Sequence, residues 1–196
     1  MRPSLAWATL LVVLLFAGCA AAPRQAAPPP APPAWLATPA VWRIRHMVLI
    51  ELGTMQFSVQ GLLELDTAAG TVRLAALDDF GVTLFRLTIT RADERVDFLL
   101  PLVPQGAEVT RSVAASLRRI YLEPAVIVPG EAGVVLETGP DGNVASASPR
   151  GSGGWRVWYD AYSDAGGVPV PRKIRFQQRG GASLKITQES VKRVDK

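Results

Sequence analysis

The chain has 196 residues, enough for one domain with a substantial core but too few for two such domains. Its formal charge is +4, yet only 19% of its residues are charged and they form no basic stripe, which argues against a nucleic-acid-binding protein. The only histidine, His46, cannot form a metal site by itself.

The first residues have the pattern of an export signal. Arg2 supplies a positive charge, residues 5–16 form an apolar run that is short for a transmembrane helix, and two small residues precede Cys19. The run 15–19 resembles a bacterial lipobox in which Phe16 replaces the usual leucine. This resemblance implies cleavage before Cys19 and acylation of the new terminus, for example with palmitate; an ordinary signal peptide with a chance cysteine is the alternative. We predict a lipoprotein signal peptide at 1–18.

A tether is predicted to follow the lipidated cysteine. Residues 20–40 are rich in alanine and proline, favour polyproline II and show no apolar period. At about 3.1 Å per residue, such a segment could hold a domain up to roughly 60 Å from a bilayer. The predicted organisation is therefore a tether at 19–40 and one folded β domain at 41–196.

Alternation of apolar and polar residues predicts an antiparallel sheet with one buried face. Between positions 55 and 65 the odd positions are almost all apolar, whereas most even positions are polar. The same pattern and its turn signals predict strands at 41–52, 54–66, 70–77, 82–91 and 95–100. Because short turns join these strands, they should form an antiparallel meander.

Beyond Pro101 and Pro104 the apolar period lengthens, which predicts a helix over 107–121 that packs on the apolar face of the sheet. Pro124 ends this helix. One or two short strands are expected within 126–138. Alternation then returns, and the remaining predicted strands are 155–162, 173–178 and 182–187, with a hairpin turn at Gly180-Gly181.

Basic residues gather near the C-terminus of the chain. Such clusters favour a weak attraction to anionic lipid headgroups, although a solvated face is the alternative. The residues are Arg172, Lys173, Arg175, Lys192, Arg193 and Lys196.

No catalytic, cofactor-binding or metal-binding constellation is recognisable, so we do not expect an enzyme. Gly151-Ser152-Gly153 lacks the spacing of a nucleophile elbow. Asp78 and Asp79 are adjacent carboxylates at a predicted turn, where aspartate commonly bonds its own backbone. His46 lies on an otherwise apolar strand face, which favours a buried imidazole over a catalytic one.

A wide sheet with one apolar face should curl, and incomplete cover by one helix would leave a hydrophobic cavity suited to acyl chains. A dry, fully packed core is the alternative. The residues expected to line the cavity are Trp42, Ile44, Phe57, Val59, Leu63, Phe85, Leu87, Leu117, Trp158 and Phe176.

Two runs of the chain resemble LolB, the outer-membrane lipoprotein receptor, and a related group of short lipoproteins of unassigned function. The C-terminal run comprises residues 155–162 and 168–174, followed by Gly180, Leu184 and Lys185. The middle run, 73–81, is similar to the family's strand, turn, exposed hydrophobe and glycine, with Asp79 and Phe80 in place of the usual proline and leucine. Residues 124–154 match poorly.

This resemblance implies a mainly β fold of the LolA/LolB type, a curved antiparallel half-barrel plugged by one or two helices. It also implies a monomer anchored at the periplasmic face of the bacterial outer membrane. Such a protein would take lipid or lipoprotein acyl chains, also from a periplasmic lipoprotein carrier, and pass them to the membrane, with Phe80 inserting into membrane or cargo. For Phe80, a ring folded back onto the rim of the sheet is the alternative. A structural or adaptor lipoprotein with a dry core and a protein partner is the alternative function.

Overall fold

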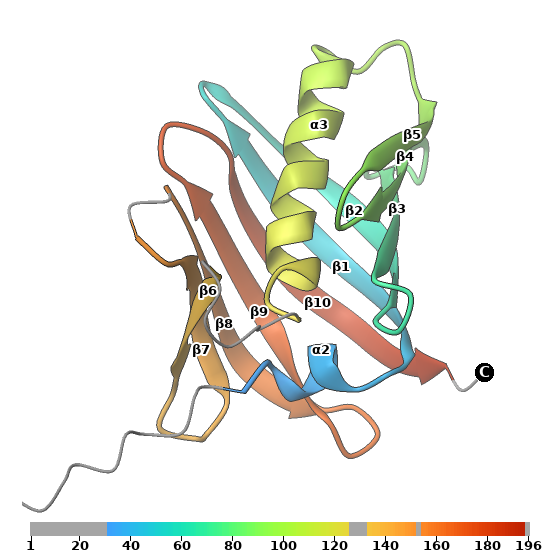
Figure 1. The fold of residues 1–196 in the computed structure, drawn as a ribbon. Coiled ribbons are helices and arrows are strands. Elements are labelled where there is room, and N and C mark those ends of the chain that lie inside the picture. Colours follow the sequence, from blue (N-terminus) through green and yellow to red (C-terminus); the bar gives the residue numbers. More distant parts are fainter. Residues whose placement is uncertain (1–30, 126–132, 152–153, 195–196) are drawn as a thin grey trace, which may run out of the picture.

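In the described part of the chain, one antiparallel sheet of ten strands forms the frame of the protein (Figure 1). The computed structural model describes residues 31–125, 133–151 and 154–194. The strands of its first half are β1 (Val41–Leu52), β2 (Met55–Asp66), β3 (Thr71–Leu77), β4 (Thr83–Thr90) and β5 (Glu94–Leu99). Those of the second half are β6 (Val134–Thr138), β7 (Val144–Pro149), β8 (Trp155–Asp164), β9 (Pro169–Gln178) and β10 (Ser183–Val194).

The sheet consists of two meanders joined by the first and the last strand. Its order is β5-β4-β3-β2-β1-β10-β9-β8-β7-β6, so neighbours in sequence are neighbours in space except at the β1–β10 pair. That pair runs from Val41 opposite Val194 to Glu51 opposite Ser183. The predicted antiparallel meander is confirmed for the first five strands. The sheet curves without closing, because within the described residues β5 and β6 each have one strand neighbour.

The alternating side chains give the sheet a buried inner face and an exposed outer face. On β1, Trp42, Ile44 and Val48 are buried, whereas Arg43 and Arg45 between them are exposed. The inner residues of both meanders belong to one hydrophobic core. All buried core residues lie between Trp35 and Ile186, so a chain that begins at residue 31 keeps every one of them. This shared core is the basis for treating residues 31–196 as an independently folding domain.

One helix crosses the inner face, where the sequence predicts it. It is α3 (Gly106–Leu117), and it continues directly into a turn of π-helix, η1 (Arg118–Leu122). α3 packs on β4 and β5, while η1 packs on β3 and β4. Two hydrogen bonds fasten η1 to the two meanders: Arg118 Nε donates to the carbonyl of Thr90 at 2.9 Å, and Tyr159 Oη donates to that of Ile120 at 2.8 Å.

The folded domain begins earlier than the predicted start at residue 41. A short helix, α2 (Ala34–Ala37), places Trp35 and Leu36 in the core, although these residues lie within the predicted tether. The Trp35 ring meets those of Tyr121 and Tyr159 edge-on, with centroids 5.7 Å and 6.4 Å apart. A helix of one turn has too few residues for an apolar period, so the sequence pattern could not indicate it.

Other differences concern the second meander. β7 was not predicted, because alanine and serine fill most of its length and give no apolar alternation. β9 and β10 are longer than the predicted 173–178 and 182–187. The predicted strand region 126–138 contains β6, while its residues 126–132 lie outside the described part of the chain.

Candidate functional site

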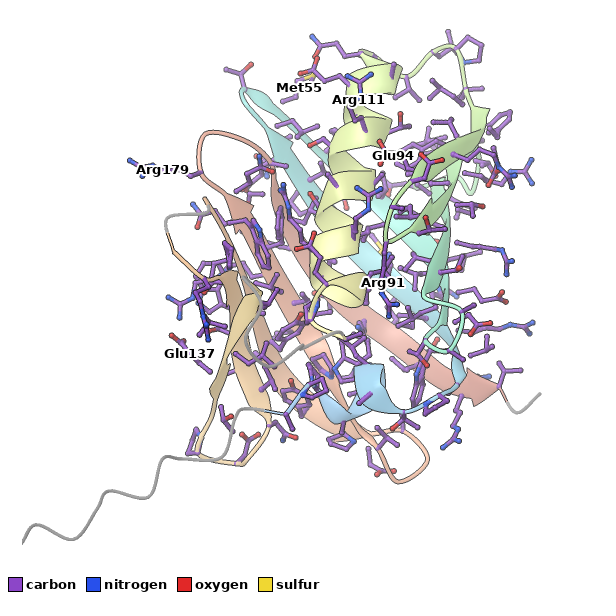
Figure 2. All side chains as sticks on the ribbon, in the orientation of Figure 1. Met55, Arg91, Glu94, Arg111, Glu137 and Arg179 are labelled. Atoms are coloured by element: carbon purple, nitrogen blue, oxygen red, sulfur yellow. The ribbon has the colours of Figure 1, made fainter. Side chains whose placement is uncertain are left out.

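A mainly apolar pocket opens at one end of the half-barrel, and we call it the rim pocket. Its volume is about 720 Å³, within the range of about 300–1,000 Å³ typical of small-ligand sites. Three segments converge on it: 54–58 after the β1–β2 turn, 78–85 around the β3–β4 turn, and the 100–104 loop that leads into α3. In Figure 2, Met55 from the first segment lies at the upper end of the molecule, as does Arg111 of α3. The lining residues are Thr54, Met55, Gln56, Phe57, Ser58, Asp78, Leu84, Phe85, Leu100, Leu102, Val103 and Pro104.

Phe80 stands beside this pocket with 93% of its surface exposed. Asp78 forms the turn, because its Oδ1 accepts the backbone N–H groups of Phe80 at 2.9 Å and of Val82 at 2.8 Å. Gly81 completes the turn at a positive φ of 81°, a conformation that glycine adopts without strain. The sequence left open whether the ring folds back onto the sheet, and the structure shows that it projects into solvent.

A second exposed hydrophobic residue, Leu102, lies on the third segment of the rim. It is 84% exposed and stands between Pro101 and Pro104. An apolar side chain inside a loop fixed by prolines is the signal that could have indicated it. Phe80 and Leu102 thus project from two of the three segments that form the rim pocket.

The residues expected to line an internal cavity occupy two kinds of position on the inner face. Phe57 and Phe85 line the rim pocket. Apart from Trp158, the remaining ones contribute to the packed core around α3 and the sheet. These core residues are Trp42, Ile44, Val59, Leu63, Leu87, Leu117 and Phe176.

The structure places Trp158 on the outer face, contrary to its predicted inward position. Its neighbours on β8, Val157 and Tyr159, are the buried residues, and strand side chains alternate. The Trp158 ring instead stacks beneath Arg175, whose Cζ lies 4.3 Å from the ring centroid. Its predicted contribution to a cavity is therefore wrong, because the C-terminal pattern did not reveal the phase of the alternation.

His46 is buried in the middle of the inner face, where its side chain is 1% exposed. It lies opposite Gly61 on one side and Gln188 on the other. A Cβ atom at position 61 would lie 1.9 Å from His46 Nε2, so glycine is required for the imidazole to fit. Burial lowers the pKa of His46 from 6.5 to about 4, which keeps the ring neutral near pH 7.

Among the described residues, no group of three or more histidine, cysteine, aspartate or glutamate side chains could hold a metal ion. No helix in that part of the chain is long and apolar enough to cross a membrane. Cys19 lies outside the described residues, so its lipidation stays a prediction.

Comparison with solved structures identifies the fold. A LolA superfamily protein from Nitrosomonas europaea superposes with a TM-score of 0.51 at 9% sequence identity, covering 83% of this chain and 92% of that protein. An outer membrane lipoprotein-sorting protein domain from Vibrio parahaemolyticus gives a TM-score of 0.46 at 5% identity, covering 80% and 86% of the two chains. No protein-family model matches the sequence, and no curated protein sequence matches it. The half-barrel has the LolA/LolB-like fold, as the sequence resemblance predicted.

Proposed function

We propose that this protein is a lipid carrier, anchored through Cys19 at the periplasmic face of the outer membrane, that binds lipid or lipoprotein acyl chains and passes them to the membrane. The observation that carries this proposal is the rim pocket with Phe80 and Leu102 exposed beside it. Exposed large apolar side chains next to an apolar pocket are typical of a site that takes an apolar partner from water. Transfer by hand-over forms no covalent bond and requires no nucleophile.

The location of the pocket suggests how a chain could enter. The rim is open to solvent and lies at the end of the half-barrel, so an acyl chain can slide between the β1–β2 hairpin and the 100–104 loop without disrupting the core around Trp35. Phe80 and Leu102 can shield the part of the chain that stays outside the pocket. The expected cargo is a lipid or acylated protein delivered by a periplasmic lipoprotein carrier.

Probe binding tests this proposal. A fluorescent apolar probe should bind the domain of residues 31–196, and a lipidated peptide should displace it. Met55→Asp places a charge in the rim pocket and should lower probe affinity about tenfold or more, because an uncompensated charge in an apolar site is disfavoured. Met47→Asp is the matched control, since Met47 lies on β1 outside this pocket. Equal probe binding by both variants, or none by the unmodified domain, would contradict acyl binding at the rim.

The adaptor alternative has its own supporting observation, the tightly buried interior. Phe85, Phe176 and Trp42 are each fully buried, as expected for a dry core. In that case a protein partner would pair with an edge strand, β5 or β6. Native mass spectrometry of the domain distinguishes the two functions, because the carrier should retain co-purified lipid and the adaptor should not.

A further inference from the structure

A second hollow of about 740 Å³ lies on the outer face of the sheet, and we call it the outer groove. Two cross-strand rows of side chains define it. The first row places Arg45, Leu62, Ala75 and Arg86 opposite one another on β1 to β4. The second row runs through Lys192, Arg43, Glu64, Arg73, Thr88 and Arg95 on β10 and β1 to β5.

The floor of the outer groove is apolar where the alternation would place a polar residue. Leu62 is 50% exposed, although its neighbours in the same phase of β2, Gln60 and Glu64, are polar. Ala75 beside it is too short to fill the space between the strands. Long side chains at both ends of the first row, Arg45 and Arg86, therefore stand as walls around a short, apolar centre.

The groove carries an excess of positive charge. Six basic residues line it and only two carboxylates, Glu64 and Asp97, do so. Glu64 is shared, because its carboxylate lies 3.4 Å from Arg43 and 2.9 Å from Arg73. The basic lining residues are Arg43, Arg45, Arg73, Arg86, Arg95 and Lys192.

Two of these six cations, Arg86 and Lys192, form no ion pair with a carboxylate of the described residues, whereas the others do. Asp97 pairs with Arg95 at 2.6 Å, and Glu189 at the edge of the groove pairs with Arg45 at 2.8 Å. Arg86 lies over the ring of Phe98, with its Cζ 5.6 Å from the centroid, and its positive charge helps to lower the pKa of Asp97. A guanidinium fork matches the geometry of a phosphate group, and a recess between several such forks suits a phosphate headgroup.

We infer that the outer groove docks on the phosphate headgroups of an anionic phospholipid bilayer. The arginines that form the walls then engage phosphates, and the short apolar floor at Leu62 and Ala75 leaves room for headgroups between them. The geometry of the β3–β4 hairpin favours a bilayer over an acidic protein, because its stem carries Arg73 and Arg86 and its tip carries Phe80. Phe80 lies five positions after Ala75, about 17 Å of chain at roughly 3.3 Å per residue, so a tilted domain brings groove and tip to one surface.

This docking goes beyond the proposed function, since it involves neither the rim pocket nor Cys19. It also assigns a role to only one of the C-terminal basic residues, Lys192, which reaches the groove through the β1–β10 pairing. Arg175, by contrast, is stacked on Trp158 on another part of the sheet.

Vesicle co-sedimentation of residues 31–196 tests the inference. The domain should bind vesicles of phosphatidylcholine containing about one third phosphatidylglycerol, bind pure phosphatidylcholine far more weakly, and dissociate in about 0.5 M NaCl. Arg86→Glu/Lys192→Glu breaks no ion pair recorded among the described residues. This double variant should lower partitioning of the domain onto the anionic vesicles on the order of a hundredfold, and Arg86→Gln/Lys192→Gln should lower it by about thirtyfold. Arg150→Glu/Arg179→Glu is the matched control, with the same change in net charge at exposed sites outside the groove.

Each outcome is decisive. Docking is supported if both groove variants lose binding to anionic vesicles and the control variant does not, while thermal stability and probe binding at the rim pocket are retained. Equal loss in groove and control variants shows that only net charge matters and overturns it. No binding of the unmodified domain to anionic vesicles also overturns it, and tight binding to a polyglutamate peptide in that case would assign the groove to an acidic protein. Failure of probe binding alone affects the proposed function and leaves this inference unchanged.

Discussion

The two ends of the half-barrel are built from the same strands but differ in whether their large hydrophobic side chains are buried or exposed. At the end where α2 lies, Trp35 is fully buried against Tyr121 and Tyr159. At the opposite end, the turn holding Phe80 and the loop holding Leu102 leave both side chains in solvent. The difference indicates that the α2 end supplies stability, while the rim can present apolar surface because the core does not depend on it. The first and the last of the four predictions below test this comparison directly.

Trp35→Ala should have the largest effect. Truncation of a fully buried tryptophan leaves a cavity and should reduce the free energy of unfolding by about 3–5 kcal/mol. Urea denaturation of residues 31–196 measures this loss, and Trp158→Ala on the outer face is the control, expected to lose about 1 kcal/mol or less. Similar losses in both variants would show that α2 does not hold the core together.

Acidification should destabilise the core through His46. The folded pKa of His46, about 4, lies below its unfolded value of 6.5. The unfolded chain therefore binds a proton between these pH values and the folded chain does not. Stability should be complete above pH 6.5 and fall by roughly 3 kcal/mol as the pH approaches 4. Urea midpoints across this pH range measure the change, and His46→Gln should remove this part of the pH dependence of stability. An unchanged slope of stability against pH in that variant would contradict the prediction.

Gly61→Ala should cost about 1–3 kcal/mol, because the added methyl group would overlap His46 Nε2 and force the strand or the ring to move. Thermal unfolding measures the cost. A double-mutant cycle with His46→Ala is the sharper experiment, since the smaller side chain makes room for the methyl group. Additive effects in this cycle would show that the overlap with His46 is not the cause.

Phe80→Glu should change stability least, within about 0.5 kcal/mol, because the ring is exposed. Probe binding should persist, whereas delivery of a lipoprotein to liposomes should be impaired. Asp79→Glu is the control at the neighbouring exposed position. A large loss of stability would identify Phe80 as a core residue, and normal delivery by the stable variant would remove its proposed role in transfer.

The alternation of side chains predicted much of the first meander, because buried and exposed residues there differ sharply in polarity. β1 matches its predicted bounds, and β2 to β5 lie within a few residues of theirs. The antiparallel topology followed from turns too short for a crossover. β7 escaped prediction because small residues such as Ala145 and Ser146 suit either face of a strand.

The candidate sites were harder to predict because they depend on which segments meet in space. The rim pocket combines residues 54–58 with the 100–104 loop, more than 40 positions away in the sequence. Leu62 belongs to the outer face although it is apolar, and only the position of β2 between β1 and β3 shows that arginines surround it. The turn that holds Phe80 could be predicted, because two carboxylates and a glycine indicate a solvent-facing turn, but the direction of the ring could not.

The pairing of β1 with β10 has a consequence for the order in which the chain can assemble. β1 is the most central strand of the first half, yet one of its two neighbours spans residues 183–194 at the end of the described chain. During synthesis the first meander can form early from local contacts, but it exposes β1 as an unpaired edge until almost the whole chain is available. Contacts between residues so far apart in sequence slow folding. An open edge during that interval favours pairing with other chains, so the incomplete chain is the form most prone to aggregation and most in need of a chaperone.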